Sequence, residues 1–300
     1  MAQKQAWETL HEIADRAAPE IKKAFIEAIA DTKKGVVLSK LQRALISGRL
    51  DQALQIAAKA WDASSPAFKS KFASKMIEIF ERVSDPKVAS QMLPPQITMR
   101  FDMSNPLAFD YIQRYTSETI SGMDAEIQRG IRAIVSQAFR TGAHPFEQAR
   151  QIRELIGLSE REAKAVQNFR KRTEKMAEQT RVAGVRPRRG LTVDRLDRIV
   201  RKYADKLLSN SAVTIARTAT IDAANEAQRQ LWSQAKRNGL LTGTWERVWI
   251  ITPDDKLCPL CATMRGKRAP IDGRFGNGKL GPTLHPRCRC AVGLVRKRAQ

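Results

Sequence analysis

The spacing of apolar residues changes once along the chain, from the period of a helix to that of a strand, and this change restricts the fold class. Up to about residue 240, apolar side chains recur every three or four positions, the period of a helix with one buried face. From Thr244 to Ile251 the sequence TWERVWII alternates instead and is rich in aromatic and β-branched residues, as strands are. Short strands are also expected in GKRAPI and CAVGLV. The sequence therefore predicts a mainly α-helical protein followed by a small C-terminal β-rich module.

The first 95 residues are expected to form a helical N-terminal module. Its first helix carries an apolar stripe that begins at Trp7, and Pro19 is expected to kink or divide it. The stripes in this module are interpreted as core packing. Further helices are expected to start at three points: Leu38, Leu50 and Pro66.

Four prolines between residues 84 and 106 interrupt the helical period, and a boundary between modules is expected near residues 90 to 105. The chain then divides into a central helical module, residues 96–240, and the β-rich module, residues 241–300. Ser159 and Glu162 have the spacing of a capping box, which predicts a helix start.

The long Ala-rich helix that ends the central module carries several polar residues. Gly239 is expected to end this helix in a left-handed conformation. His144 is interpreted as a solvated turn residue, because no cysteine or acidic cluster is near it in sequence. Solvent contact or hydrogen bonding between helices is expected for four residues: Arg217, Asp222, Asn225 and Glu226.

The charge of the chain favours an anionic partner. It has 53 Lys and Arg against 31 Asp and Glu, a formal net charge of +22, so nucleic acid is the first expectation and an acidic membrane the second. The loop RVAGVRPRRG holds no acid and is either a solvated linker or a phosphate contact. The sequence contains neither a signal-type start nor an apolar run of the roughly 18 residues that a membrane span needs, so we expect a protein kept in the cytosol.

All four cysteines lie between Cys258 and Cys290, together with His285. Cys258 and Cys261 have the CxxC spacing of a metal knuckle, and His285 with Cys288 gives HxxC. A tetrahedral zinc ion needs four ligands, so we assign Cys258, Cys261, His285 and one of Cys288 or Cys290. A module of about 35 Gly-rich residues buries little apolar surface, and a bound ion supplies the missing folding free energy.

Three other uses of the cysteines are less favoured. A redox CxxC is expected at a strand-to-helix step of a βαβ unit, and the sequence has no such unit here. Disulfides are rare in the cytosol. A catalytic zinc requires an open coordination position and a nearby general base, and Asp272 is the one acid after Lys256. We therefore expect a structural metal and no enzymatic activity.

Several stretches resemble the phage Mu F-like head morphogenesis, or minor head protein, family. They are NPLAFDYIQRYTSETISGMDAEIQRGIRAIVSQAFRTG, IGLSEREAKAVQNFRK, ARTATIDAANEAQRQLW, WERVWIITPDDKLCPLCATMRGKRAPID and LHPRCRC, within roughly residues 105–295. The CxxC with HPxCRC is the most distinctive. The resemblance implies a minor capsid component of a tailed bacteriophage that acts in head assembly, in few copies, at or near the portal inside the head.

The resemblance and the charge together give one functional hypothesis. The helical body contacts the portal or the major capsid protein, and basic residues bind packaged double-stranded DNA without sequence preference. The protein is then made in the host bacterial cytoplasm and ends in the virion, without a membrane partner. The expected DNA contacts are Arg181, Arg186, Arg188, Arg189, Arg296, Lys297 and Arg298.

The alternative hypothesis is a free DNA-binding zinc-ribbon protein, which also predicts DNA affinity. A His-Cys metal nuclease is less favoured, because His285 would have to leave the metal to act as a base. The other histidines, His11 and His144, lie far away in sequence.

Overall fold

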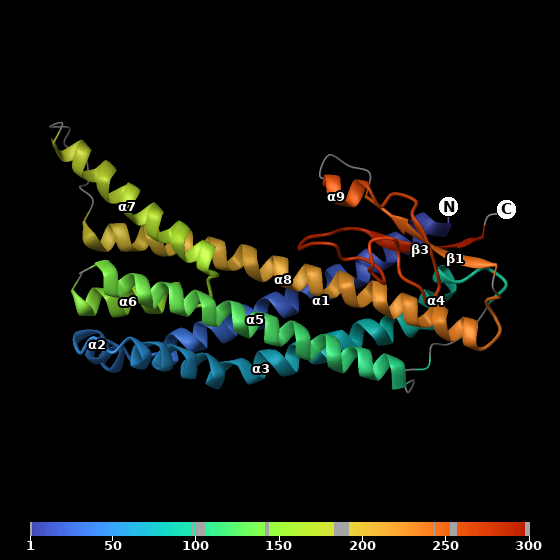
Figure 1. Ribbon diagram of the computed structural model, residues 1–300, viewed down its shortest axis with the longest axis horizontal. Helices are drawn as coiled ribbons and strands as arrows, with labels where there is room; N and C mark the ends of the chain where they lie inside the picture. The colour runs from blue at the N-terminus through green and yellow to red at the C-terminus, as the bar shows by residue number, and fades with distance from the viewer. Residues whose placement is uncertain are drawn as a thin grey trace. The chain divides into compact units, whose positions relative to one another are not determined.

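The chain folds almost entirely into helices, followed by a small sheet. The computed structural model describes residues 2–97, 99, 102, 106–141, 144–182, 192–242, 244–252 and 257–297. Within these residues, no helix is both long and apolar enough to cross a membrane. The elements in chain order (Figure 1) are α1 (Ala2–Gly35), α2 (Leu38–Ile46), α3 (Leu50–Ser84), α4 (Pro86–Met92), α5 (Pro106–Thr141), α6 (Pro145–Leu155), α7 (Glu160–Val182), α8 (Val193–Arg237), β1 (Trp245–Ile250), α9 (Pro259–Ala262), β2 (Arg268–Pro270) and β3 (Ala291–Arg296).

The chain forms two compact units, and each is assembled from distant segments. One unit comprises Met1–Lys22, Ser70–Thr119 and Val213–Gln300, and the other comprises Lys23–Lys69 and Ile120–Ala212. Each unit thus contains parts of α1, α3, α5 and α8. The three modules expected in chain order, 1–95, 96–240 and 241–300, stay a prediction about domain organisation.

Two prolines lie inside helices that continue through them. The expectation of a separate helix starting at Pro66 is wrong, because α3 runs without a break from Leu50 to Ser84. Pro19 likewise lies inside α1 and does not divide it. Proline removes one backbone hydrogen bond. Close packing on either side of Pro66 offsets that loss, since Trp61 and Phe68 are 1% and 2% exposed.

The unit that contains α2 and α6 has an aromatic core and close helix contacts. The ring of Phe25 lies 5.5 Å from that of Phe68 and 6.5 Å from that of Trp61. Figure 1 shows α2 and α6 side by side, and they contact each other. The turn between α6 and α7 requires glycine at 157, where φ is +91° and a Cβ would lie 2.7 Å from Ile29.

Two expected helix ends are confirmed. The backbone N–H of Glu162 donates to Ser159 Oγ at 3.3 Å, and Glu162 Oε2 accepts from the N–H of Ser159 at 3.0 Å. This is the reciprocal capping box expected from sequence. Gly239 follows α8 with φ of +74°, the left-handed cap expected there. His144 is exposed and accepts from the N–H of Phe146 at the start of α6.

The three expected strands form one antiparallel sheet in the order β2-β1-β3. Trp249 pairs with Val292 and Val248 pairs with Arg268. Arg247 and Trp249 point to the buried face of β1. The Trp249 ring meets Phe275 edge to face at 5.0 Å. The Gly-rich segment after β2 therefore covers the sheet and supplies part of its core.

Candidate metal centre

The first two cysteines lie on a single helical turn. Cys258 is the N-cap of α9, and its Sγ accepts a hydrogen bond from the backbone N–H of Cys261 at 3.2 Å. Pro259 at the first helical position suits this turn, because its missing N–H would have no partner there. The CxxC spacing thus places both sulfur atoms on the same side of the turn.

His285 faces this pair of cysteines with one ring nitrogen. Its Nδ1 lies 2.8 Å from the carbonyl oxygen of Pro286, so Nδ1 carries the proton and donates it there. Nε2 is left with a lone pair and lies 3.1 Å from both Cys258 Sγ and Cys261 Sγ. A carbonyl-bound Nδ1 with a free Nε2 is the usual state of a metal-binding histidine.

The five residues form two overlapping groups that share Cys261. The donor atoms of Cys258, Cys261 and His285 lie within 4.8 Å of one another, and so do those of Cys261, Cys288 and Cys290. Cys261 Sγ is 3.8 Å from Cys288 Sγ. All four cysteines are free thiols. The structure thus brings together all the residues that the sequence singled out as metal ligands.

The spacing of these atoms can be compared with that of a tetrahedral zinc site. Zn–S bonds of about 2.3 Å and Zn–N bonds of about 2.0 Å imply sulfur–sulfur distances of roughly 3.8 Å and sulfur–nitrogen distances of roughly 3.5 Å. The distance from Cys261 to Cys288 agrees with this value. The distances from the cysteines to His285, 3.1 Å, are shorter. An entering ion would move the imidazole outward slightly, and the cluster could then hold a metal.

The thiols differ in acidity because of their neighbours. A hydrogen bond from Cys290 lowers the pKa of Cys288 to about 5. The same bond, together with burial, raises the pKa of Cys290. Burial raises the pKa of Cys261 to about 12, whereas the backbone N–H of Cys261 lowers the pKa of Cys258. Metal binding must therefore displace a proton from Cys261 at neutral pH.

Helix α8 contacts the loop that carries His285, Cys288 and Cys290. The backbone N–H of Arg287 donates to Thr218 Oγ1 at 3.0 Å, and its Nε donates to Thr214 Oγ1 at 2.7 Å. Asn225 Nδ2 donates to the carbonyl of Cys290 at 3.4 Å. Arg287 has a φ of +63°, an uncommon conformation that these contacts hold in place.

A polar cavity of about 390 Å³ lies along α8 beside this loop. Asp222, which lines it, accepts from the backbone N–H of Thr283 at 3.0 Å. Burial raises the pKa of Asp222 to about 6. Glu226, on the same wall, accepts from Arg229 Nε at 2.7 Å. Of the four polar residues expected to contact solvent or another helix, Arg217 pairs with Asp15 of α1 at 3.6 Å. Asp222 and Asn225 instead bond to the segment 283–290, and Glu226 pairs with Arg229 of its own helix.

Arg247 is a buried cation that sequence reasoning took for an ordinary strand residue. It is 1% exposed, and its guanidinium donates to the backbone carbonyls of Pro270, Gly273 and Leu280. Burial lowers its pKa to about 10, so it stays charged at neutral pH. It fastens the Gly-rich segment to β1.

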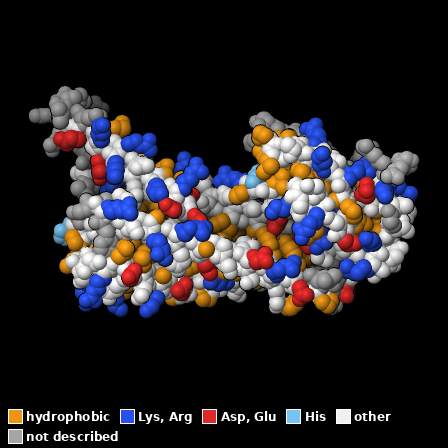
Figure 2. Space-filling model, in the orientation of Figure 1, with side chains coloured by type: hydrophobic (Ala, Val, Ile, Leu, Met, Phe, Trp, Pro, Cys, Tyr) orange, Lys and Arg blue, Asp and Glu red, His pale blue; other side chains and the backbone are white. Residues whose placement is uncertain are grey.

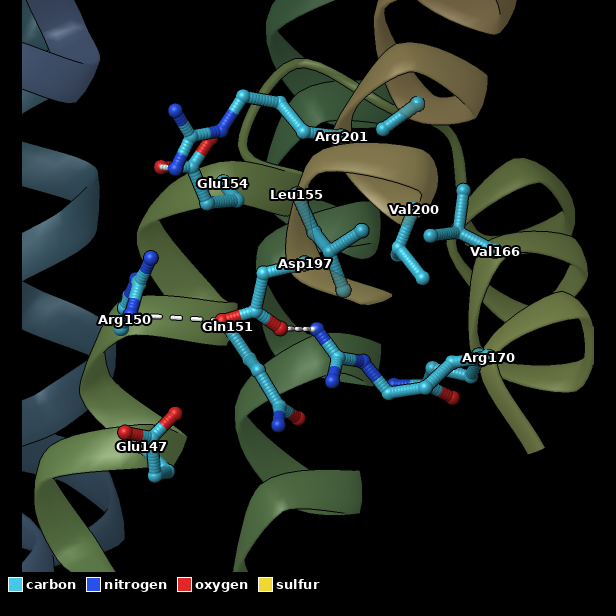
Figure 3. Close-up of a pocket in the computed structure, with 12 residues that line it drawn as sticks. Glu147, Arg150, Gln151, Glu154, Leu155, Val166, Arg170, Asp197, Val200 and Arg201 are labelled. Atoms are coloured by element: carbon cyan, nitrogen blue, oxygen red, sulfur yellow. Dashed lines mark hydrogen bonds and ion pairs between the residues drawn. The ribbon is translucent and has the colours of Figure 1, made fainter. Parts of the chain in front are cut away.

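The other unit contains a smaller cavity, of about 40 Å³, between α6, α7 and α8. Figure 3 shows Asp197 between two arginines: Arg150 at 3.3 Å and Arg170, one on each carboxylate oxygen. The space is enough for roughly one water molecule. Since both oxygens of Asp197 are bound, this cluster is suited to holding three helices together.

Two of the seven expected DNA contacts have described side chains. Arg296 and Lys297 are exposed at the end of β3, and Arg296 lies over the Trp245 ring at 5.3 Å. On the face shown in Figure 2, Lys and Arg side chains are widely spread, with acidic ones among them. The side chain of Arg181, at the end of α7, and the four residues Arg186, Arg188, Arg189 and Arg298 lie outside the described residues.

The structure corrects the expectation that His11, far from the cysteines in sequence, is also remote from them in space. His11 Nε2 lies 3.1 Å from the carbonyl of Arg289, between Cys288 and Cys290 in the chain. The sequence carried no signal for this contact beyond the spacing of Trp7 and His11 on one helix face. His144 lies in the other unit.

These features define a class of protein: long helices followed by a three-stranded antiparallel sheet with a Cys/His cluster that could hold a metal ion. A family model described as "Phage Mu protein F like protein" matches residues 184–293. The match confirms the resemblance seen in the motifs and covers α8 and the whole Cys/His cluster. Residues 105–183 of the expected resemblance lie outside it. No curated protein and no solved structure matches the chain.

Proposed function

We propose that this protein is a minor head protein of a tailed bacteriophage that acts in head assembly as a structural component, without catalysis. The observation that carries the proposal is the match to the Phage Mu F-like family, which includes every residue of the Cys/His cluster. The family supports a phage head-related protein in the coarse sense. Its position at or near the portal, inside the head, is the finer part of the proposal.

The proposed cofactor is a structural Zn²⁺ bound by Cys258, Cys261, His285 and Cys288. Cys288 is favoured over Cys290 because its sulfur lies at a zinc-like distance from that of Cys261. Cys290 then remains a thiol and donates a hydrogen bond to Cys288. Single substitutions Cys288→Ser and Cys290→Ser, each followed by measurement of bound zinc, test the assignment. Loss of zinc is expected for Cys288→Ser alone, and the reverse pattern would overturn it.

The proposed partners are the portal or major capsid protein and packaged double-stranded DNA. The net charge of +22 supports the DNA contact, and the exposed residues Arg296 and Lys297 are among the cations proposed to make it. Binding to DNA is expected to weaken steeply as salt rises, because it depends on the release of counterions. A gel-shift series that shows no binding, or binding unaffected by salt, would remove DNA from the proposal.

Quantitative mass spectrometry of purified phage particles and DNA-free proheads tests the central claim, with the portal protein as the copy-number reference. A few copies per particle in both preparations are expected. If the protein is missing from both while the portal is detected, a minor head protein is excluded, and a free DNA-binding protein becomes the better explanation.

A further inference from the structure

We propose that Trp7 and His11 of α1 position the metal loop, residues 283–290, so that the N-terminal turns of α1 belong to the metal centre. The inference rests on the proposed metal site but not on the phage function. It gives a role to a segment that the family match does not include, since the match begins at residue 184.

The contacts converge on one backbone atom, the carbonyl oxygen of Arg289. It accepts from Trp7 Nε1 at 3.3 Å, from His11 Nε2 at 3.1 Å and from Thr252 Oγ1 at 3.0 Å. Two of these three donors come from α1. Figure 1 shows the first turns of α1 beside the C-terminal strands.

The donors on α1 are arranged as a pair. Trp7 and His11 are four residues apart and therefore lie on the same face of the helix. Their rings are 4.3 Å apart and tilted by 38°. Since a carbonyl oxygen only accepts, His11 must carry its proton on Nε2. Leu10 and Ala14, at 2% and 0% exposed, pack the helix into the unit beside this pair.

The contacts to the carbonyl of Arg289 affect the cysteines because this carbonyl lies in the backbone between Cys288 and Cys290. Arg289 separates Cys288 from Cys290, and its carbonyl lies in the rigid peptide plane that leads to Cys290. Fixing the oxygen fixes that plane, and with it the backbone position of Cys290, whose thiol forms a hydrogen bond with Cys288. Helix α8 fixes the neighbouring groups, through Thr218 on the N–H of Arg287 and Asn225 on the carbonyl of Cys290. The loop is thus held from α1 and from α8.

The consequence is a coupling between metal binding and the docking of α1. If the docked helix favours the loop geometry that binds the ion, the ion must favour docking to the same extent. Partners that orient metal ligands typically change metal affinity by about 10- to 100-fold when they are removed. We therefore expect effects of that order when both α1 donors are lost.

The experiment uses the full-length protein loaded with Co²⁺, whose absorption spectrum reports thiolate ligands. The release of Co²⁺ to excess EDTA is followed for the protein, for Trp7→Phe with His11→Ala, and for Glu12→Gln as the matched control. Trp7→Phe keeps most of the ring but removes the N–H. Glu12 lies next to His11 in the chain, and among the described residues it forms an exposed pair with Arg16.

Release is expected to be about 10-fold faster or more in the double variant and unchanged in Glu12→Gln. Restoring a side-chain N–H with His11→Gln in the Trp7→Phe background should recover part of the slow release. An unchanged rate in a double variant that is folded by circular dichroism would overturn the inference. So would equal acceleration by Glu12→Gln, which would point to general weakening of α1.

A second measurement covers the case in which the double variant fails to fold. Hydrogen exchange in the unaltered protein is compared with and without EDTA. Removal of the metal is expected to accelerate exchange in residues 7–18, while α2 and α6 in the other unit stay unchanged. Equal protection of residues 7–18 in both states would reject the coupling. If the unaltered protein binds no Co²⁺ or Zn²⁺ at all, the metal centre itself fails, which is a separate result.

Discussion

The Cys/His cluster and the Asp197 cluster both bury polar side chains, but they satisfy them differently. Asp197 has an arginine on each carboxylate oxygen, so its charge is balanced by the protein itself. The Cys/His cluster gathers four thiols and an imidazole whose donor atoms converge. A cluster that supplies both charges holds helices together by itself, whereas a cluster of converging donor atoms could hold an added metal ion.

The largest expected effect comes from Cys261→Ser, because Cys261 belongs to both groups of donors. The variant should lose nearly all bound zinc, and the β-rich segment should lose its fixed structure, since structural zinc in small domains contributes on the order of 10 kcal/mol. Metal analysis and near-UV circular dichroism check this. Full zinc retention would show that the ion, if present, does not use the shared thiol.

Arg247→Met is expected to rank second. It keeps the bulk of the side chain but leaves the carbonyls of Pro270, Gly273 and Leu280 without their donor. The free energy of unfolding should fall by about 3 kcal/mol or more. Urea denaturation measures it, with Arg247→Lys as the control that keeps the charge. A fall in unfolding free energy below 1 kcal/mol would mean that water replaces the guanidinium as the donor to these carbonyls.

Asp222→Asn is expected to stabilise the protein at neutral pH. Burial raises the pKa of Asp222 from 3.8 to about 6, so the folded state holds this proton more tightly than the unfolded state. Stability therefore falls as pH rises from about 4 to 6 and stays lowered above pH 6, by about 3 kcal/mol. Asparagine removes this penalty and can still accept from Thr283.

The difference in unfolding free energy between Asp222→Asn and the unaltered protein should be positive at pH 7.5 and close to zero at pH 4. Both proteins are measured by urea denaturation at the same zinc concentration, so that the contribution of the metal is common to both and cancels in the difference. A difference that does not change with pH would contradict the assignment of this titration to Asp222.

Asp197→Asn is expected to have the smallest effect. The free energy of unfolding should fall by about 1 to 3 kcal/mol. The carboxylate side chain is 8% exposed, but Arg150 and Arg170 are 29% and 19% exposed and regain part of their hydration. The loss should be the same with and without EDTA, because this cluster needs no ion. If the loss of unfolding free energy depended on EDTA, the Asp197 cluster would also depend on a metal ion, and the two clusters would not differ in this respect.

The sequence predicted the Cys/His cluster well because local spacing controls much of it. CxxC across one helical turn and HxxC across one loop fix which side chains meet, and Ser159 with Glu162 fixed a helix start for the same reason. Pro66 was misjudged, since packing on both sides of a proline is a tertiary effect. The carbonyl contacts of Arg247 could not be foreseen either, because a backbone acceptor can belong to any residue.

The contact between His11 and Arg289 joins residues 278 positions apart in the chain. Contacts of such long range form late in folding, because the entropy of closing the loop must be overcome first. Until residue 289 has been synthesised, Trp7 and His11 lack the carbonyl oxygen to which they donate. The first turns of α1 can therefore complete this contact only after the loop between Thr283 and Cys290 has been synthesised.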